Sequence, residues 1–268
     1  MTTTRAKLSR ICQSSGVGEF CSPADLGGGY RKCLPPLVAE TMLVDRGSVL
    51  WRQGEQADTL YWVRSGALKS TRSSECISES VTGLWLPGDL VGLGALCTGQ
   101  RTDTLTALVT SEVALMPTAA LIEQAGRNGG LMTALMSLLS REILRHEEHM
   151  TIMGKATSQQ RVALFLIGLM ARSGSEAGQE AVVDLYMTRD EIAAFLGLRM
   201  ETVTRRLREL HHRGIIALSG RRVFIRDLDA LAQSACLISS NTGQTSSSGQ
   251  GGAVAREPPP ASSHGRSY

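Results

Sequence analysis

Residues 188–213 read TRDEIAAFLGLRMETVTRRLRELHHR, and this stretch decides the fold of the C-terminal part of the chain. Thr188 with Glu191 three residues on forms a capping box, which predicts a helix starting directly after the threonine. Gly197 predicts the end of that helix, because glycine adopts the left-handed C-cap conformation without a steric penalty. A second amphipathic helix is predicted over about residues 200–211. Two short helices joined by such a turn indicate a helix-turn-helix.

The second helix sorts its residues onto two faces. The apolar face consists of Val203, Leu207 and Leu210. The opposite face gathers polar and charged side chains: Glu201, Thr204, Arg205 and Arg208. Arginine pairs bidentately with guanine and glutamate accepts from the amino group of cytosine, so this face could read bases in a major groove. The alternative is a solvated amphipathic helix in an all-α domain.

Positive charge is concentrated on this part of the chain. The formal net charge is +3, while residues 199–222 hold seven arginines against two glutamates, a net charge of +5. The rest of the chain therefore carries −2. A local excess of this kind on a DNA-reading element predicts a nucleic-acid partner better than a uniform excess would.

Composition limits the other function classes. The first ten residues, MTTTRAKLSR, lack the apolar segment of a secretory signal. The longest apolar run, residues 162–171, is too short to span a bilayer. We therefore expect a cytoplasmic protein without a membrane partner, whose six cysteines are thiols or metal ligands rather than disulfides. No nucleophile–base spacing, P-loop or H-E-x-x-H motif is present, so no enzyme is expected.

The 268 residues are enough for two domains. Changes in hydrophobic pattern and composition along the chain divide it into five segments. Short strands with glycine turns at roughly ten-residue spacing predict a β-roll. The low-complexity tail predicts disorder. The fold class is α+β, and the segments are an irregular N-terminal arm (1–34), a β-roll (35–126), a long helix (127–154), a helix-turn-helix domain (155–237) and the tail (238–268).

The long helix, predicted over about residues 131–153, carries two apolar stripes. One has alternating steps of three and four residues, as in a coiled-coil seam: Met136, Leu139, Ile143, His146, Met150 and Met153. The other is expected to pack on the roll: Leu131, Leu135, Leu138 and Leu144. One inward and one outward stripe predict a homodimer, and the alternative is a helix buried on two sides of a monomer. We expect His146 to tune packing or dimerisation rather than to bind a metal.

A hairpin is predicted over residues 215–225, with its turn at Ser219–Gly220. A hairpin behind a helix-turn-helix makes a winged helix. Basic side chains around the second helix and on the wing are expected to contact phosphates, which position a protein on DNA without specifying sequence. These residues are Arg199, Arg206, Arg221 and Arg222.

The order of roll, long helix and winged helix-turn-helix resembles the Crp/Fnr family of bacterial transcription regulators. The stretches that carry the resemblance are SGALKS (65–70), LPGDLVG (86–92), LMTALMSLLSREI (131–143) and DLYMTRDEIAAFLGLRMETVTRRLREL (184–210). The resemblance covers about residues 35–235. It implies a cyclic-nucleotide-binding-type β-roll, a dimerisation helix and a winged helix-turn-helix. It also implies a homodimer on a palindromic promoter site in double-stranded DNA, with half-sites about 34 Å apart. Contact with RNA polymerase, as activator or repressor, is implied as well.

The Fnr-like branch of the family reads bases with the pattern E-x-x-[S/T]-R. Glu201, Thr204 and Arg205 match it. The match implies a G·C pair read by arginine, with each such contact contributing about 1–3 kcal/mol of discrimination. The other function class is a ligand-binding regulatory module acting on a protein partner, which would lack a DNA-reading helix.

Cyclic AMP is disfavoured as the signal. Members of the family that bind it carry an acidic residue and an arginine after the GD turn. In this chain Leu93 or Gly94 stands at the acidic position. Arg101–Thr102 could mimic the phosphate-binding half, but with one residue of spacing missing.

Oxygen-sensing members hold a [4Fe–4S] cluster with N-terminal cysteines and one cysteine of the roll. The resemblance makes Cys12, Cys21 and Cys33 candidate ligands, with Cys97 or Cys76 as the fourth. Two departures weaken the match: the N-terminal gaps are 8 and 11 residues rather than short, and alanine stands at the roll position before the MP dipeptide. A thiol-based redox role, or cysteines without a special role, stay open.

Overall fold

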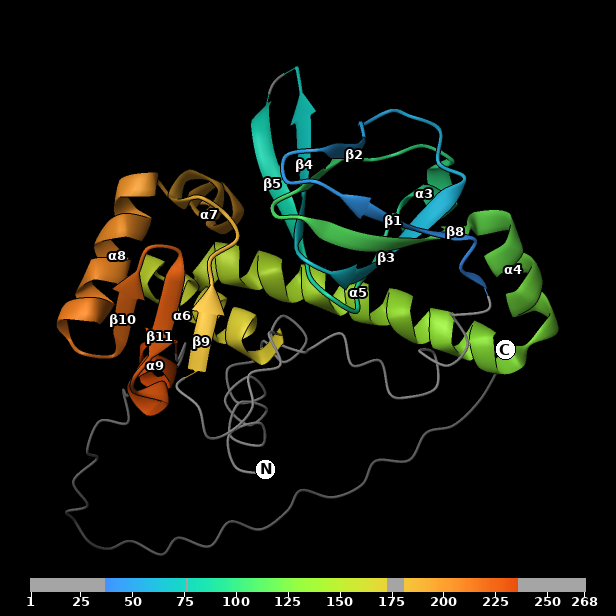
Figure 1. Ribbon diagram of the computed structural model, residues 1–268. Helices are drawn as coiled ribbons and strands as arrows, with labels where there is room; N and C mark the ends of the chain where they lie inside the picture. Colours follow the sequence, from blue (N-terminus) through green and yellow to red (C-terminus); the bar gives the residue numbers. More distant parts are fainter. Residues whose placement is uncertain (1–36, 76, 173–180, 236–268) are drawn as a thin grey trace, which may run out of the picture. The chain divides into compact units, whose positions relative to one another are not determined.

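The computed structural model describes residues 37–75, 77–172 and 181–235. Its first part is a roll of two four-stranded sheets, with strand orders β1-β8-β3-β6 and β2-β7-β4-β5 (Figure 1). The predicted roll is therefore confirmed. Its strands are β1 (Glu40–Val44), β2 (Val49–Trp51), β3 (Thr59–Ser65), β4 (Leu68–Ser74), β5 (Ile77–Trp85), β6 (Leu90–Val91), β7 (Thr104–Ala107) and β8 (Ser111–Pro117).

The strands of the roll pair antiparallel, for example Tyr61 with Leu115 and Leu68 with Trp85. Side chains that alternate along these strands meet in an apolar core. At the turn between β3 and β4, Gly66 has a φ of 87°, and a Cβ there would lie 2.2 Å from Oγ of Ser111. Only glycine fits that turn, through which the chain passes from β3 in one sheet to β4 in the other.

Three helices accompany the roll: α3 (Ala95–Thr98), α4 (Thr118–Arg127) and α5 (Gly129–Lys155). Helix α5 is the predicted long helix, extended by two residues at each end. It begins after Asn128, whose side chain accepts from the amides of Gly130 and Leu131. Leu131 and Leu138 are buried against the roll, as expected.

The predicted inner stripe of α5 is wrong at one position, because Leu144 is 47% exposed. It lies six residues beyond Leu138, which turns it about 120° around a helix of 3.6 residues per turn. The inner face instead continues through Arg145, whose side chain is 15% exposed.

The remaining elements form a winged helix-turn-helix, as predicted. A three-stranded sheet of order β10-β11-β9 packs beside the helices, so the strand before the helix-turn-helix extends the predicted hairpin. Helix α6 runs through the middle of the core, with nine successive residues, 162–170, buried. The elements are α6 (Ser158–Arg172), β9 (Ala181–Asp184), α7 (Arg189–Leu196), α8 (Met200–His212), β10 (Ile216–Ser219), β11 (Arg222–Ile225) and α9 (Leu228–Ala235).

One apolar cluster joins this second part to the roll. It includes Leu84 of β5 and Leu86 directly after that strand, together with residues of α6, α7 and α8. The predicted domain boundaries stay a prediction, since the core is continuous across them. None of the described helices is long and apolar enough to cross a membrane. The predicted N-terminal arm and tail lie outside the described residues.

Candidate nucleic-acid interface

The first helix of the helix-turn-helix begins and ends as the sequence predicts. The amide of Glu191 donates to Oγ1 of Thr188 at 3.2 Å, and the amide of Thr188 donates to the Glu191 carboxylate at 2.7 Å. This is the reciprocal capping box. Gly197 then adopts the left-handed conformation, with φ 58° and ψ 41°. A Cβ there would lie 3.3 Å from Nη1 of Arg161 and from Sδ of Met153, so the turn needs glycine on two counts.

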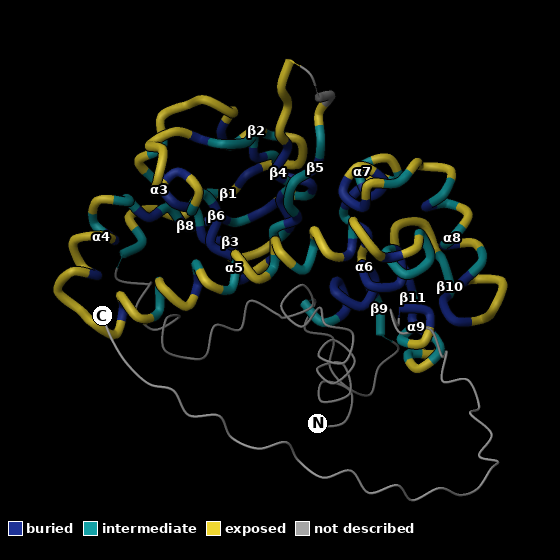
Figure 2. The backbone as a smooth tube through the Cα atoms, turned by 180° about the vertical axis from the view of Figure 1, so that it is seen from behind, coloured by how far each residue is buried: buried dark blue, intermediate teal, exposed yellow. Residues whose placement is uncertain are grey.

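The second helix, α8, separates its faces as expected. Val203, Leu207 and Leu210 are at most 3% exposed. The outward face forms an open groove, and α8 is exposed along this side (Figure 2). The groove is lined by Met200, Glu201, Thr204, Arg205, Arg208, Glu209 and His212. The structure thus brings the three candidate base-reading residues together, and Arg208 and His212 extend the same face toward the C-terminus.

The guanidinium of Arg205 is accessible. Its side chain is 62% exposed, and Nε lies 3.9 Å from the Glu209 carboxylate, a loose contact across solvent. Exposed ion pairs of this kind contribute little. Arg205 can therefore exchange Glu209 for a base edge at small cost.

The four candidate phosphate contacts differ in their surroundings. Arg199 is exposed at the N-terminus of α8. Arg222 is exposed on the wing, with Nε 3.4 Å from Asp184. Arg221 is also exposed but donates to the carbonyl of Tyr186 at 3.0 Å.

Arg206 does not fit the predicted phosphate role. Its Nε donates to Oγ of Ser158 at 2.9 Å, and Nη1 donates to the Glu209 carboxylate at 2.7 Å. Position 206 lies on the flank of α8, between its buried and exposed faces, and its guanidinium reaches the start of α6. Arg206 therefore ties α8 to α6 within the domain.

The outward stripe of α5 is exposed over most of its predicted length (Figure 2). Met136, Ile143 and Met150 are 54%, 59% and 68% exposed. The side chain of His146 is 62% exposed and contacts Glu142 at 3.4 Å. Leu139 is half-buried.

The predicted seam ends one step early. Met153 is partly buried against the core that contains α6 to α8, so it does not belong to the exposed stripe. Its Sδ lies 3.8 Å from Nη1 of Arg161. The dimer itself stays a prediction.

An ion pair joins the roll directly to the helix-turn-helix. Nζ of Lys69, on β4, lies 2.6 Å from Oε1 of Glu191, on α7. Burial alone would raise the pKa of Glu191, but hydrogen bonds from Lys69 and Thr188 outweigh it and lower that pKa. Sequence reasoning missed this contact, because 122 residues separate the partners and neither position carries a pattern that points to the other.

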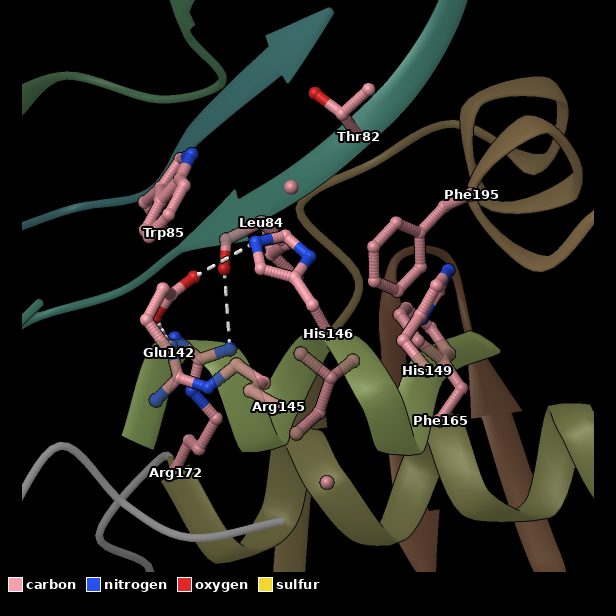
Figure 3. Close-up of a pocket in the computed structure, with 13 residues that line it drawn as sticks. Thr82, Leu84, Trp85, Glu142, Arg145, His146, His149, Phe165, Arg172 and Phe195 are labelled. Atoms are coloured by element: carbon pink, nitrogen blue, oxygen red, sulfur yellow. Dashed lines mark hydrogen bonds and ion pairs between the residues drawn. The ribbon is translucent and has the colours of Figure 1, made fainter. Parts of the chain in front are cut away.

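A small cavity lies beside this junction, between β5, α5, α6 and α7 (Figure 3). Its volume is about 50 Å³, room for a few water molecules. The ring of His149 on α5 faces that of Phe195 on α7, with centroids 4.8 Å apart. Burial, and then the charges of His146 and Arg161, lower the pKa of His149.

A buried charge cluster borders the same cavity. Asp89, in the LPGD turn of the roll, is 4% exposed and accepts from the Leu86 amide at 2.8 Å. The Arg172 guanidinium at the end of α6 also donates to it, and Nη1 of Arg145 on α5 lies 3.8 Å away. The roll, α5 and α6 therefore meet at one carboxylate.

A larger cavity, about 260 Å³, lies within the roll next to α5. Arg101 in its wall is 5% exposed and stacks 4.1 Å from the ring of Trp51. Its Nη2 donates to the Thr59 carbonyl at 2.6 Å, whereas Nε and Nη1 are buried without a hydrogen-bond partner. Leu93 and Gly94 line the cavity and supply no carboxylate. The position where cyclic-AMP-binding relatives carry an acidic residue therefore holds no carboxylate here, and the acidic side chains in the cavity wall are those of Asp103 and Glu142.

The iron–sulfur prediction falls largely outside the described residues. Four of the five candidate ligands are not among the described residues: Cys12, Cys21, Cys33 and Cys76. The fifth, Cys97, is an exposed free thiol on α3. Over residues 37–75, 77–172 and 181–235, no group of three or more His, Cys, Asp or Glu side chains could hold a metal. The cluster stays a prediction.

Comparison with known proteins gives the same two-part architecture. Residues 42–128 match the cyclic nucleotide-binding domain, and residues 160–234 match the Crp-like helix-turn-helix domain. The fumarate and nitrate reduction regulatory protein of Escherichia coli is 31% identical over 83% of this chain and 89% of its own. The transcriptional activator protein Anr of Pseudomonas protegens is 34% identical over 83% of this chain and 91% of its own.

A solved structure supports the same relationship. FixK2 from Bradyrhizobium japonicum aligns with a TM-score of 0.66 at 30% identity. The alignment covers 74% of this chain and 97% of FixK2.

Proposed function

We propose that this chain, which belongs to the Crp/Fnr family of transcription regulators, binds an inverted repeat in double-stranded DNA as a homodimer. Its helix-turn-helix makes it a DNA-binding regulator. The observation that carries the proposal is the outward face of α8, which presents acidic, hydroxyl and basic side chains in an open groove. A helix with this face enters a major groove by its N-terminal residues.

Each proposed base contact has a chemical role. Arg205 donates two hydrogen bonds to O6 and N7 of guanine, and Glu201 accepts from the amino group of cytosine. Thr204, one turn beyond Glu201, contacts a base or its methyl group. Exposure of Glu201 and Arg205 supports these roles, because neither side chain must break a buried contact to reach DNA.

Phosphate contacts would come from the ends of this surface. Arg199 at the N-terminus of α8 is exposed, and its helix N-terminus attracts anions as well. Arg221 and Arg222 on the wing are exposed too. We leave Arg206 out of the proposed set, because its guanidinium is bonded to Ser158 and Glu209.

The homodimer would form through the outward stripe of α5. Met136, Ile143 and Met150 present large apolar side chains to solvent at heptad-like spacing. Such a stripe on a helix of 27 residues is the surface that a coiled-coil partner covers. Two copies related by a two-fold axis would place two α8 helices on successive major grooves, about 34 Å apart.

We propose two alternative signals to which the protein could respond. In one, Cys12, Cys21 and Cys33 with Cys97 or Cys76 hold a [4Fe–4S] cluster, as oxygen-sensing members of the family do. In the other, the 260 Å³ cavity of the roll takes a small ligand. The absence of a carboxylate at positions 93 and 94 argues against cyclic AMP there.

Visible absorption and iron content of protein purified without oxygen separate these two signals. A brown protein with about four irons per chain supports the cluster. A colourless protein without iron supports a ligand in the roll. We further propose that the regulator works in the cytoplasm and contacts RNA polymerase, as the family resemblance implies.

Selection from random duplex DNA tests the proposed function. We expect purified protein to enrich an inverted repeat whose half-sites are centred about one helical turn apart and contain a G·C pair. Enrichment of no sequence, or of a single unrepeated motif, would contradict it. The alternative, a regulatory module that acts on a protein partner, predicts no enrichment at all.

A further inference from the structure

We infer that Arg161 is the positioning residue that fixes the recognition helix α8 on the dimerisation helix α5. This rests on the proposed function, since it concerns how two recognition helices are held at the spacing of one DNA site. Arg161 lies in the first turns of α6, outside the DNA-reading face. Its guanidinium joins the ends of two other helices.

One end is that of α5. Nη2 of Arg161 donates to the carbonyl of Met153 at 2.5 Å, and Nε donates to the carbonyl of Ala156 at 3.0 Å. The last carbonyls of a helix have no partner within it, so an external donor there fixes the chain exit. The positive charge also lies at the negative end of the α5 dipole.

The other end is the turn of the helix-turn-helix. Nη1 donates to the carbonyl of Leu196 at 3.0 Å and to that of Gly197 at 3.3 Å. These carbonyls end α7 and begin the turn that leads into α8. One side chain therefore bonds to the C-termini of both α5 and α7.

The guanidinium of Arg161 is closely packed by its neighbours. A Cβ at Gly197 would lie 3.3 Å from both Nη1 of Arg161 and Sδ of Met153. Three residues before Arg161, Oγ of Ser158 accepts from Nε of Arg206 on α8 at 2.9 Å. The first turn of α6 is thus bonded to the dimer helix, to the turn and to the recognition helix.

Only two residues, 156 and 157, separate α5 from α6. Together with the Lys69–Glu191 pair and the apolar cluster shared with the roll, the Arg161 bonds hold the helix-turn-helix against rotation about this short link. The planar guanidinium supplies several donors in fixed directions, whereas a lysine ammonium cannot reach carbonyls of both helices in the same way. This geometry therefore lets Arg161 fix the position of the DNA-reading surface of α8 relative to the dimerisation helix α5.

Dependence on half-site spacing tests this role. Affinity is measured for the wild type, Arg161→Ala and Arg161→Lys on the selected inverted repeat, on repeats with one base pair inserted or removed, and on a single half-site. An inserted base pair moves one half-site by about 3.4 Å along the duplex. The control is Arg127→Ala, which removes an exposed arginine of α4 that pairs, within the described part of the chain, with Glu123 one turn away.

We expect the wild type and Arg127→Ala to lose about tenfold or more in affinity when spacing changes by one base pair, about 1.4 kcal/mol. Arg161→Ala should bind the selected repeat about tenfold more weakly and discriminate spacing less than threefold. Its single-half-site affinity should equal that of the wild type. Arg161→Lys should lie between the two.

A uniform loss of affinity on every DNA, with the wild-type spacing preference intact, would overturn the inference and leave Arg161 a purely structural residue. Arg161→Lys keeps the charge, so the spacing test remains decisive if Arg161→Ala does not fold. Failure of the proposed function itself is distinguishable, because the wild type would then show no spacing preference at all.

Discussion

The ammonium of Lys69 on the roll lies 2.6 Å from the carboxylate of Glu191 in the first turn of the helix-turn-helix. Glu191 at the same time closes the capping box of α7. The side chains are 17% and 21% exposed, so the pair is screened less than a surface ion pair. One carboxylate thus starts the DNA-binding helix pair and fastens it to the roll.

A double-mutant cycle measures this link. We expect Lys69→Met and Glu191→Gln to couple by about 1–2 kcal/mol in the free energy of unfolding at pH 7, between the values for exposed and charge-assisted pairs. Glutamine keeps the capping box, so the cycle isolates the contact with the roll. The control Arg46→Met, in an exposed turn, should show no coupling with Glu191→Gln. Strictly additive effects of the first pair would contradict the link.

Stability should depend on pH through His149. Burial lowers the pKa of this histidine below its ordinary value of 6.5, so the folded protein resists a proton that the unfolded chain accepts. The contribution of the neutral ring is therefore complete above pH 6.5 and is lost as pH falls below it, by at most about 1.4 kcal/mol per pH unit.

Denaturant unfolding between pH 7.5 and 5.5 checks this prediction. His149→Gln should flatten the fall in unfolding free energy, whereas His212→Gln, on the exposed face of α8, should leave it as in the wild type. The same slope in all three proteins would show that His149 is not the group responsible.

The outward stripe of α5 should hold the dimer. Ile143→Glu places a charge on the exposed apolar face, and desolvating it in a coiled-coil interface would be unfavourable. We expect a monomer at micromolar concentration by equilibrium sedimentation and at least about tenfold weaker binding to the inverted repeat. Ser137→Glu, exposed on another side of α5, should remain dimeric. If the Ile143→Glu and Ser137→Glu variants were both dimeric, or both monomeric, the result would contradict this interface.

Local sequence signals predicted the helix-turn-helix closely. The capping box at Thr188 and the left-handed Gly197 each depend on residues a few positions apart, so their chemistry is readable from the chain. The split of α8 into a buried and a charged face follows from helical periodicity in the same way.

The sequence alone did not predict the contacts between segments that are far apart along the chain. Lys69 and Glu191 are 122 residues apart, and Arg161 reaches carbonyls 35 and 36 residues away. The composition of α8 did not reveal that Arg206 turns toward Ser158, because its position on the flank depends on where α6 packs. Leu144 was misplaced for a similar reason: an apolar residue in a helix does not by itself say which face is covered.

The most direct measurement is the affinity of the wild type and Arg205→Ala for the selected site and all its single-base-pair variants. We predict that the wild type loses about 1–3 kcal/mol when one G·C pair in each half-site is changed. Arg205→Ala should lose that discrimination at this pair alone and keep the other preferences. An Arg205→Ala protein that retains the wild-type preference at every position would contradict the account of α8 as the DNA-reading helix.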